Sequence, residues 1–246
     1  MSHSVIIMAG GLGKRMESNL PKVLHKVLNK PMLVHVIETS LSLKPDNIFI
    51  IVGKYLSVIE DILNKYDILK YIKFVEQSEA LGTGHAIQCC RDHIKDLNSK
   101  ILILSGDVPL IKENTLLQMI NKLDKARIMT TVLDDPYGYG RIIENNNVFS
   151  KIVEEKDANE EEKKCTKVNA GIYAFDSNIL YKYLPYLSND NAQKEFYLTD
   201  IVEIIKNNEN IDIELFNMLK EQQIELTGVN TKKQLEDLNK LLKYKK

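Results

Sequence analysis

The sequence predicts an α/β fold, with a Rossmann-like, mostly parallel sheet flanked by helices and a smaller mixed β lobe over that sheet. Two observations lead to this prediction. In the first half of the chain, short aliphatic runs alternate with stretches of helical spacing, and after Ile128 strand-like runs follow one another with turns between them. Strand, helix and strand in repetition indicate parallel strands, and the change after Ile128 indicates a second, mixed part.

The elements of the first half follow from their local patterns. The aliphatic runs show no polar alternation, as expected for strands that are covered on both faces. The stretch over 30–41 has a proline near its start, where a helix tolerates it, followed by apolar residues at helical spacing. We expect strands over 5–8, 48–52, 72–75 and 101–104, and helices over 30–41, 56–66 and 84–94.

The second half reads mainly as strands. The stretch over 157–164 is nearly all charged or small, which indicates a solvated loop or helix surface rather than a docking element. Residues 231–246 predict a final amphipathic helix with a lysine-rich tail. The strands that we expect here cover 129–133, 140–143, 149–153 and 168–175.

Composition excludes several classes of partner. The chain has 246 residues, and 33 Lys and Arg against 34 Asp and Glu give a net charge of −1, so no overall field attracts nucleic acid or an acidic membrane. The three cysteines suggest neither a disulfide framework nor a metal site, and we expect reduced thiols. With no secretory leader and no long apolar run in the sequence, we expect a cytoplasmic protein.

A glycine-rich loop follows the first predicted strand. Glycines within 9–15 let backbone N–H groups approach oxygen atoms that a side chain would block, and Lys14, Arg15 and Lys22 add positive charge. The spacing fits neither the P-loop pattern G-x-x-x-x-G-K-[ST] nor the dinucleotide pattern G-x-G-x-x-G. A bare strand-to-helix turn would have no use for these cations, so we interpret the loop as a triphosphate-binding segment.

Asp107 is the candidate metal ligand. It follows a buried strand, at the carboxyl edge where parallel sheets bind ligands. A carboxylate oxygen suits Mg²⁺, which binds one or two protein ligands together with phosphate oxygens and water. Asp107 could instead only cap a turn. That alternative gives no reason for the glycine before Asp107, which permits close approach of a ligand, or for the cationic loop, which would bind the phosphates.

A second loop is a candidate for reading a base. Gly82 and Thr83 open a helical pattern, so their N–H groups face outward at a positive helix end. The amide of Gln77 carries a donor and an acceptor, which match the imide edge of uracil. We interpret His85 as a packing or capping histidine.

These groups suit nucleotidyl transfer. A sugar 1-phosphate has a second pKa of about 6, so its attacking oxygen is anionic at neutral pH and needs no general base. The reaction requires that the attacking oxygen be aligned with the α-phosphate, that the charge on the repelling phosphate oxygens be neutralised, and that the departing pyrophosphate be stabilised.

The motifs together resemble one family. Leu81-Gly-Thr-Gly-His85, Leu104-Ser-Gly-Asp-Val-Pro109, Gly138-Tyr-Gly-Arg-Ile142, Val168-Asn-Ala-Gly171 and Gly228-Val-Asn230 accompany the glycine-rich loop. With these residues the chain resembles the nucleotide-sugar pyrophosphorylase family, and within it the N-terminal uridylyltransferase domain of bacterial GlmU, over roughly residues 4–240.

The resemblance implies a role for each matching residue. Arg15 is implied as the catalytic arginine and Lys22 as a phosphate contact. Asp107 and Asn230 are implied as the protein ligands of Mg²⁺. Uridine contacts are implied for Met8, Ala9, Gly10, Gly11, Gln77, Gly82 and Thr83, with Ser105 and Gly106 lining the same site; Gly140, Glu154 and Asn169 are implied to hold the N-acetylglucosamine portion, with Glu195, Tyr197 and Thr199 shaping its pocket.

The chain departs from the family pattern at a few positions. Gly10 and Lys14 replace a common alanine and threonine, Ser105 stands where an aromatic residue is frequent, and Ala170 replaces a common threonine. We also expect no hexapeptide β-helix acetyltransferase domain. The expected organisation is a nucleotidyltransferase domain over 1–230, with a nucleotide-binding half over 1–127 and a sugar-binding half over 128–230, followed by a C-terminal helix and tail over 231–246.

The implied reaction is UTP + N-acetylglucosamine-1-phosphate giving UDP-N-acetylglucosamine + pyrophosphate, with Mg²⁺ as cofactor and no nucleic-acid or membrane partner. A homodimer is a candidate oligomeric state. The alternatives are a glucose-1-phosphate uridylyl- or thymidylyltransferase, or a catalytically silent protein that binds nucleotide sugars.

Overall fold

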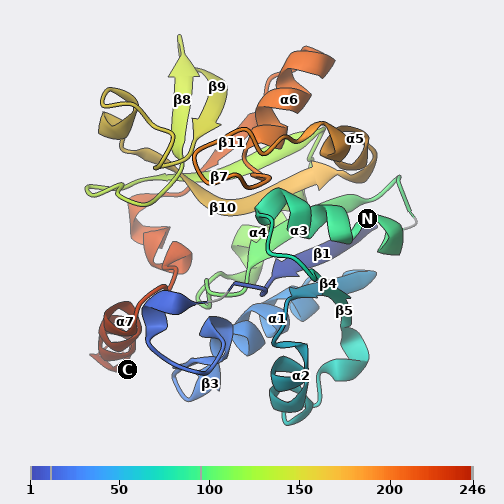
Figure 1. Cartoon of the computed structure of the whole chain (residues 1–246), viewed down its shortest axis with the longest axis vertical. Helices are drawn as coiled ribbons and strands as arrows, with labels where there is room; N and C mark the ends of the chain where they lie inside the picture. The colour runs from blue at the N-terminus through green and yellow to red at the C-terminus, as the bar shows by residue number, and fades with distance from the viewer. Residues whose placement is uncertain (1, 12, 95, 245–246) are drawn as a thin grey trace.

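The computed structural model describes residues 2–11, 13–94 and 96–244, which fold around a nine-stranded sheet (Figure 1). Along its main path the strand order is β11-β7-β10-β6-β1-β4-β5, and the hairpin β8–β9 branches from β10. A separate ladder joins two short strands near the N-terminus. The strands are β1 His3–Met8, β2 Lys26–Val27, β3 Lys30–Pro31, β4 Asn47–Val52, β5 Lys73–Glu76, β6 Lys100–Ser105, β7 Ala126–Val132, β8 Arg141–Asn145, β9 Val148–Val153, β10 Lys167–Asp176 and β11 Glu214–Asn217.

The strand directions confirm the α/β prediction and refine it. The pairs β1–β4, β1–β6, β4–β5 and β7–β11 are parallel, whereas β10 runs antiparallel to both β6 and β7. The second half was expected as a lobe lying over the sheet. Instead β7 and β10 continue the main sheet, and the β8–β9 hairpin rises from it at the top of Figure 1.

Helices cover both faces of the sheet. Val5 and Ile7 of β1 belong to one buried cluster, with residues of α1, α2 and α4, while Ile6 belongs to the other, with residues of α3, α5 and α6. Alternate β1 side chains therefore enter two separate cores, which explains why residues 5–8 of this strand are all apolar. The helices are α1 Met32–Ser42, α2 Leu56–Asn64, α3 Thr83–Cys89, α4 Glu113–Ile120, α5 Ser177–Tyr183, α6 Asp200–Glu209 and α7 Lys232–Tyr244.

Several boundaries differ from the predicted ones. α3 ends at Cys89 and is followed by a short 3-10 turn over Arg91–His93, so the helix expected over 84–94 is two elements. The polar stretch over 157–164 is a largely exposed loop that ends in a 3-10 turn. The end of the predicted lysine tail, residues 245–246, lies outside the described residues. Within the described ranges, no helix combines the length and apolar character needed to cross a bilayer.

The last helix packs against the first loop of the chain. Leu238 of α7 shares a buried cluster with Met16, Val27, Met32 and Val229. The side chain of Asn239 accepts a hydrogen bond from Leu28 N at 3.0 Å and donates one to Lys26 O at 3.1 Å. Figure 1 shows α7 beside the blue N-terminal segment. The C-terminal helix therefore supports the segment that carries the glycine-rich loop.

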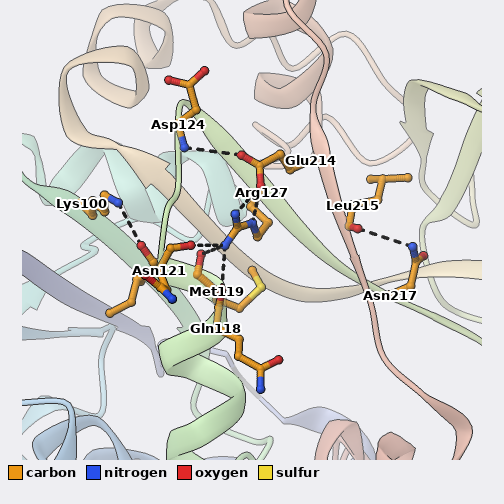
Figure 2. A network of polar contacts seen from close by, with 10 residues as sticks. Lys100, Gln118, Met119, Asn121, Asp124, Arg127, Glu214, Leu215 and Asn217 are labelled. Atoms are coloured by element: carbon orange, nitrogen blue, oxygen red, sulfur yellow. Dashed lines mark hydrogen bonds and ion pairs between the residues drawn. The ribbon is translucent and has the colours of Figure 1, made fainter.

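The positively charged side chains of Arg127 and Lys100 cap the C-terminal end of α4. Arg127 Nη1 donates to the carbonyl oxygens of Gln118, Met119 and Asn121 at 2.6, 2.9 and 3.0 Å (Figure 2). Lys100 Nζ donates to Ile120 O at 3.0 Å. These carbonyls have no partner inside the helix, and positive charge is favourable at this helix end.

Arg127 also joins the helix to the edge of the sheet. Its Nε donates to Glu214 Oε2 of β11 at 2.7 Å, and its Nη2 contacts the same oxygen. One guanidinium group thus connects α4, β7 and β11.

We expect Arg127→Met to lower the free energy of unfolding by about 2–3 kcal/mol, because several charge-assisted bonds are lost together. Urea unfolding followed by circular dichroism would measure the change. Arg91→Met is the control, since Arg91 lies exposed on the 3-10 turn after α3. Equal stabilities of the two variants would contradict the prediction.

Candidate active site

A cavity of about 430 Å³ lies at the carboxyl edge of the parallel strands. β1 pairs with β4 on one side and β6 on the other, while the chain reaches β6 only after β4 and β5. The strand order therefore reverses at β1, the place where open α/β sheets bind ligands. The cavity is lined by the predicted residues Met8, Gly10, Gly11, Lys22, Gln77, Gly82, Thr83, Ser105 and Asp107, and by Gly13, Val23, Ile51, Ala80, Ala86 and Glu195, which were not predicted to contact the nucleotide.

Ala9 and Gly106 lie beside this cavity without lining it. Ala9 N donates to Ile51 O at 2.8 Å, and Gly106 N donates to Met8 O at 3.0 Å. The first bond extends the strand ladder by one residue beyond the end of β1, and the second by one residue beyond the end of β6. A Cβ on Gly106 would lie 3.2 Å from Met8 O and from Val23 Cγ1, so the close approach of these segments favours glycine.

Gly13 shapes the loop that carries the cations. Its φ of +58° is unfavourable for other residues, and a Cβ there would lie 2.7 Å from Lys22 Cβ. The glycine therefore lets Lys22 pack directly against the loop. Its place within the glycine-rich segment was the only sequence signal for this role.

Lys22 joins the two predicted metal ligands. Its ammonium group contacts Asp107 Oδ2 and donates to Asn230 Oδ1 at 2.9 Å. Ser105 Oγ donates to the other carboxylate oxygen, Asp107 Oδ1, at 2.6 Å. The backbone N–H of Val229 donates to Asp107 O at 3.0 Å and holds the 228–230 segment in place. One cation, one carboxylate, one amide oxygen and one hydroxyl are thus assembled beside the cavity.

This arrangement fits a magnesium ion. One ammonium nitrogen reaches both Asp107 Oδ2 and Asn230 Oδ1, so a single cation can contact both oxygens. The described residues contain no cluster of three or more His, Cys, Asp or Glu side chains suited to a metal. Mg²⁺ needs fewer protein ligands than that, since phosphate oxygens and water complete its octahedral shell.

Arg15 lies apart from this cluster. It belongs to the 3-10 turn Lys14–Met16, its side chain is exposed, and it does not line the cavity. The next residue, Met16, is buried, which anchors the backbone beside Arg15. The side chain of Lys14 lies outside the described part of the structure. The predicted catalytic role of Arg15 therefore requires its side chain to move toward the phosphates.

The second loop forms one wall of the cavity. Gly82, the residue before α3, has a φ of +112°, and a Cβ on it would lie 2.5 Å from Phe196 O. Phe196 N donates to Leu81 O at 2.8 Å, and Leu198 N donates to Thr83 Oγ1 at 3.0 Å. The 195–198 segment therefore closes tightly over this loop. That packing explains why Glu195, which was expected to shape the sugar pocket, lines this cavity.

The three predicted sugar-binding residues meet one another at the base of the β8–β9 hairpin. Asn169 N donates to Gly140 O at 2.9 Å. A Cβ on Gly140 would lie 2.9 Å from Ile152 Cγ2 and 3.5 Å from both carboxylate oxygens of Glu154. Asn169 Nδ2 also donates to Tyr173 Oη at 2.6 Å, across an irregular stretch of β10. These residues come together although they lie outside the cavity described above.

Carboxyl groups gather beside Glu154. Thr199 Oγ1 donates to Glu154 Oε1 at 3.0 Å, and Tyr197 Oη donates to Asp157 Oδ2 at 3.2 Å. Burial raises the pKa of Glu154, and the nearby charge of Asp157 adds to the shift. Burial, followed by the charge of Glu154, raises the pKa of Asp200 to about 6. This region therefore favours neutral carboxyl groups.

The raised pKa of Asp200 predicts a pH-dependent stability. The folded state favours the neutral acid, so the contribution of Asp200 is most favourable below its ordinary pKa of 3.8 and is lost as the pH rises through about 6. Asp200→Asn is expected to be about 1–2 kcal/mol more stable than the parent at pH 8, after allowance for partial exposure, and similar to it near pH 4. Urea unfolding at both pH values measures this difference. Asp61→Asn, on the exposed side of α2, is the control, and a difference independent of pH would contradict the argument.

The fold and the glycine-lined cavity at the sheet edge define a class. Residues 4–242 match the family model described as nucleotidyl transferase, and the chain belongs to this family of enzymes. A probable UDP-N-acetylglucosamine pyrophosphorylase of Acanthamoeba polyphaga mimivirus is 43% identical, over 99% of this chain and 98% of that protein. The bifunctional protein GlmU of Clostridium botulinum is 41% identical over 99% of this chain and 52% of its own length. GlmU of Idiomarina loihiensis is 44% identical over 100% of this chain and 53% of its own length.

These matches confirm the resemblance identified from the motifs. The chain spans about half the length of the GlmU relatives and nearly all of the viral protein. A glucose-1-phosphate thymidylyltransferase structure, described as putative, from Bacillus anthracis superposes with a TM-score of 0.77 at 22% identity, covering 98% of this chain and 95% of the other. A UDP-glucose pyrophosphorylase structure superposes with a TM-score of 0.74 at 18% identity, with both chains fully covered. At such identities the superpositions establish the fold alone.

Proposed function

We propose that this protein transfers a uridylyl group from UTP to N-acetyl-α-D-glucosamine-1-phosphate and releases pyrophosphate, with Mg²⁺ as cofactor. The viral relative, whose name describes a probable UDP-N-acetylglucosamine pyrophosphorylase, supports the choice of UDP-N-acetylglucosamine as product. The observation that carries the reaction class is the contact of Lys22 with Asp107 and Asn230 beside the glycine-lined cavity.

The cavity suits the nucleotide. Backbone groups of Gly10, Gly11 and Gly13 leave room for oxygen atoms where side chains would intrude. Lys22 would neutralise charge on the triphosphate, which lets an anionic nucleophile approach. Mg²⁺, when bound through Asp107 and Asn230, would supply further neutralisation and would favour the departure of pyrophosphate.

The reaction is an in-line displacement. An oxygen of the sugar phosphate forms a bond to the α-phosphorus, and the bond from that phosphorus to the bridging oxygen of pyrophosphate breaks. Because the nucleophile is already anionic near neutral pH, no proton need be removed. The protein therefore contributes alignment and charge stabilisation. Arg15 is proposed to contact the phosphates after its exposed side chain closes over them.

The cluster of Gly140, Glu154 and Asn169 is proposed to hold the N-acetylglucosamine portion. The lack of a side chain at Gly140 leaves the Glu154 carboxyl open on that side. A buried carboxyl and an amide provide acceptors and donors for sugar hydroxyl groups. A sugar bound there would have to lie with its phosphate directed toward Lys22.

Pyrophosphate release tests the proposal. The assay uses UTP and Mg²⁺ with N-acetylglucosamine-1-phosphate, in parallel with glucose-1-phosphate and with dTTP. Release that is fastest with UTP and the acetylated sugar supports the proposal. Preference for another pair would establish a different sugar nucleotide as product, and binding of UDP-N-acetylglucosamine without any release would indicate a catalytically silent protein.

A further inference from the structure

The amide of Gln77 has a defined orientation in the cavity wall. Its Nε2 donates to Gly82 O at 3.0 Å and lies 3.2 Å from His85 Nδ1. A backbone carbonyl oxygen can only accept hydrogen bonds, so the NH₂ group, not the amide oxygen, must face Gly82. Both amide hydrogens are then used within the protein, which corrects the expectation that Gln77 offers a donor and an acceptor to a base.

His85 reinforces that orientation. To accept the second amide hydrogen, its Nδ1 must be unprotonated, which places the proton of the neutral ring on Nε2. On that side lies Cys89 Sγ, 4.0 Å from Nε2. Burial raises the pKa of the Cys89 thiol, so this neighbour is a neutral thiol able to accept a weak bond. The hydrogen bonds therefore run in one direction, from the Gln77 amide to His85 Nδ1 and from His85 Nε2 to the Cys89 sulfur.

The amide oxygen of Gln77 remains for a ligand. Within the described part of the chain, no donor reaches Gln77 Oε1. It lies beside Gly10, 3.4 Å from where a Cβ on that glycine would be, and both residues line the cavity. The Gln77 side chain therefore offers the cavity a hydrogen-bond acceptor and no donor.

We propose that His85 is a positioning residue that sets base choice: it holds Gln77 so that only Oε1 faces the cavity, which selects pyrimidines with an N3–H over cytosine. This inference rests on the proposed function, because it takes the cavity to be the nucleotide site. Uracil and thymine carry a hydrogen on N3, which Oε1 can accept, whereas N3 of cytosine is itself an acceptor.

Rotating the amide would allow cytosine to bind, and His85 opposes that rotation. A rotated amide would direct Oε1 at Gly82 O, where two acceptors would face each other without a proton, and at His85 Nδ1, which could donate only if the ring moved its proton away from Nε2, the side of Cys89. If His85 is replaced by a residue without a ring nitrogen, the cost at position 85 disappears and only the repulsion between Oε1 and Gly82 O opposes the rotation. His85 thus adds to the discrimination without touching the base.

The test compares binding of UTP, dTTP and CTP, each with Mg²⁺, by isothermal titration calorimetry. His85→Phe removes the acceptor and keeps an aromatic ring beside Phe196, whose ring centre lies 6.4 Å from that of His85. His85→Asn keeps an acceptor, since Asn Oδ1 takes the position of Nδ1. His93→Phe is the matched control, because His93 also packs near an aromatic ring, Phe49, with ring centres 6.2 Å apart.

We expect the preference for UTP over CTP to fall about tenfold or more in His85→Phe. It should stay within about threefold of the parent in His85→Asn and in His93→Phe, and the ratio of UTP to dTTP should not change in any variant. His85→Leu carries the same test should His85→Phe fail to fold. An unchanged preference in the variant lacking the acceptor, or an equal loss in His85→Asn, would overturn the inference. The calorimetry needs no sugar phosphate, so failure of the transfer assay is separable from failure of this role.

Discussion

Asp107→Asn is expected to lower the rate of pyrophosphate release by about a hundredfold or more at saturating Mg²⁺, since each ~1.4 kcal/mol lost from transition-state stabilisation costs a factor of ten. The Asp107 carboxylate accepts hydrogen bonds from Ser105 Oγ and Lys22 Nζ. Asp107 is only 6% exposed, so water screens its charge poorly. An amide there would keep the shape of the side chain but would neither attract a metal ion nor hold the Lys22 ammonium.

Steady-state kinetics with varied Mg²⁺ would measure this loss, and thermal unfolding would show that the fold is retained. The matched control is Asp124→Asn, because Asp124 is exposed just before β7, at the opposite edge of the sheet from the cavity. A variant at position 107 that matches the parent once Mg²⁺ is saturating would remove Asp107 from the proposed site.

Lys22→Met should have two separable effects. Turnover should fall by about two orders of magnitude, because a cation facing the triphosphate is lost. The nucleotide-free protein should nevertheless bind divalent cations about tenfold more tightly, because the ammonium group that now contacts Asp107 and Asn230 no longer competes for their oxygens. A tethered positive charge and a metal ion cannot both stay between these two side chains.

Titration of Mn²⁺ by electron paramagnetic resonance, with no nucleotide present, would measure the affinity directly. Lys26→Met tests whether a general change in charge is enough, since Lys26 is exposed on the nearby strand β2. If both variants bind Mn²⁺ as the parent does, Asp107 and Asn230 do not form the metal site.

Local patterns predicted the core of the sheet well. The strands β1, β4 and β6 are largely apolar and buried on both faces, whereas the edge strand β5 is partly exposed; the boundaries of all four differ from the predicted ones by one or two residues. The strand β11 was missed because it has only four residues and depends on distant partners, namely β7 and the contact of Glu214 with Arg127. The helices α4, α5 and α6 were not predicted, although Ile201 and Ile205 of α6 show the spacing of a buried helix face.

The position of Asp107 at the sheet edge followed from the strand before it. Its partners could not be obtained in that way. Lys22 and Asn230 are 208 residues apart in sequence, and only the folded chain brings them together. The orientation of the Gln77 amide likewise depends on a carbonyl oxygen and a ring nitrogen, whose directions no residue pattern records. The sequence therefore predicted a set of candidate groups, and the structure showed which donors and acceptors these groups use with one another.

The packing of α7 under the N-terminal loop has a consequence for the protein during its synthesis. Lys22 of the glycine-rich segment leaves the ribosome 208 residues before Asn230, and the helix that supports this segment follows Asn230. The neighbouring strands β1, β4, β5 and β6 all lie before residue 106, so they can pair while the later residues are still being made. A partly made chain would then hold a sheet in which Lys22 and Asp107 lack their partner Asn230. The contact of Lys22 with Asn230 can therefore form only after residue 230 has been made, when the 228–230 segment and α7 dock beside the N-terminal loop.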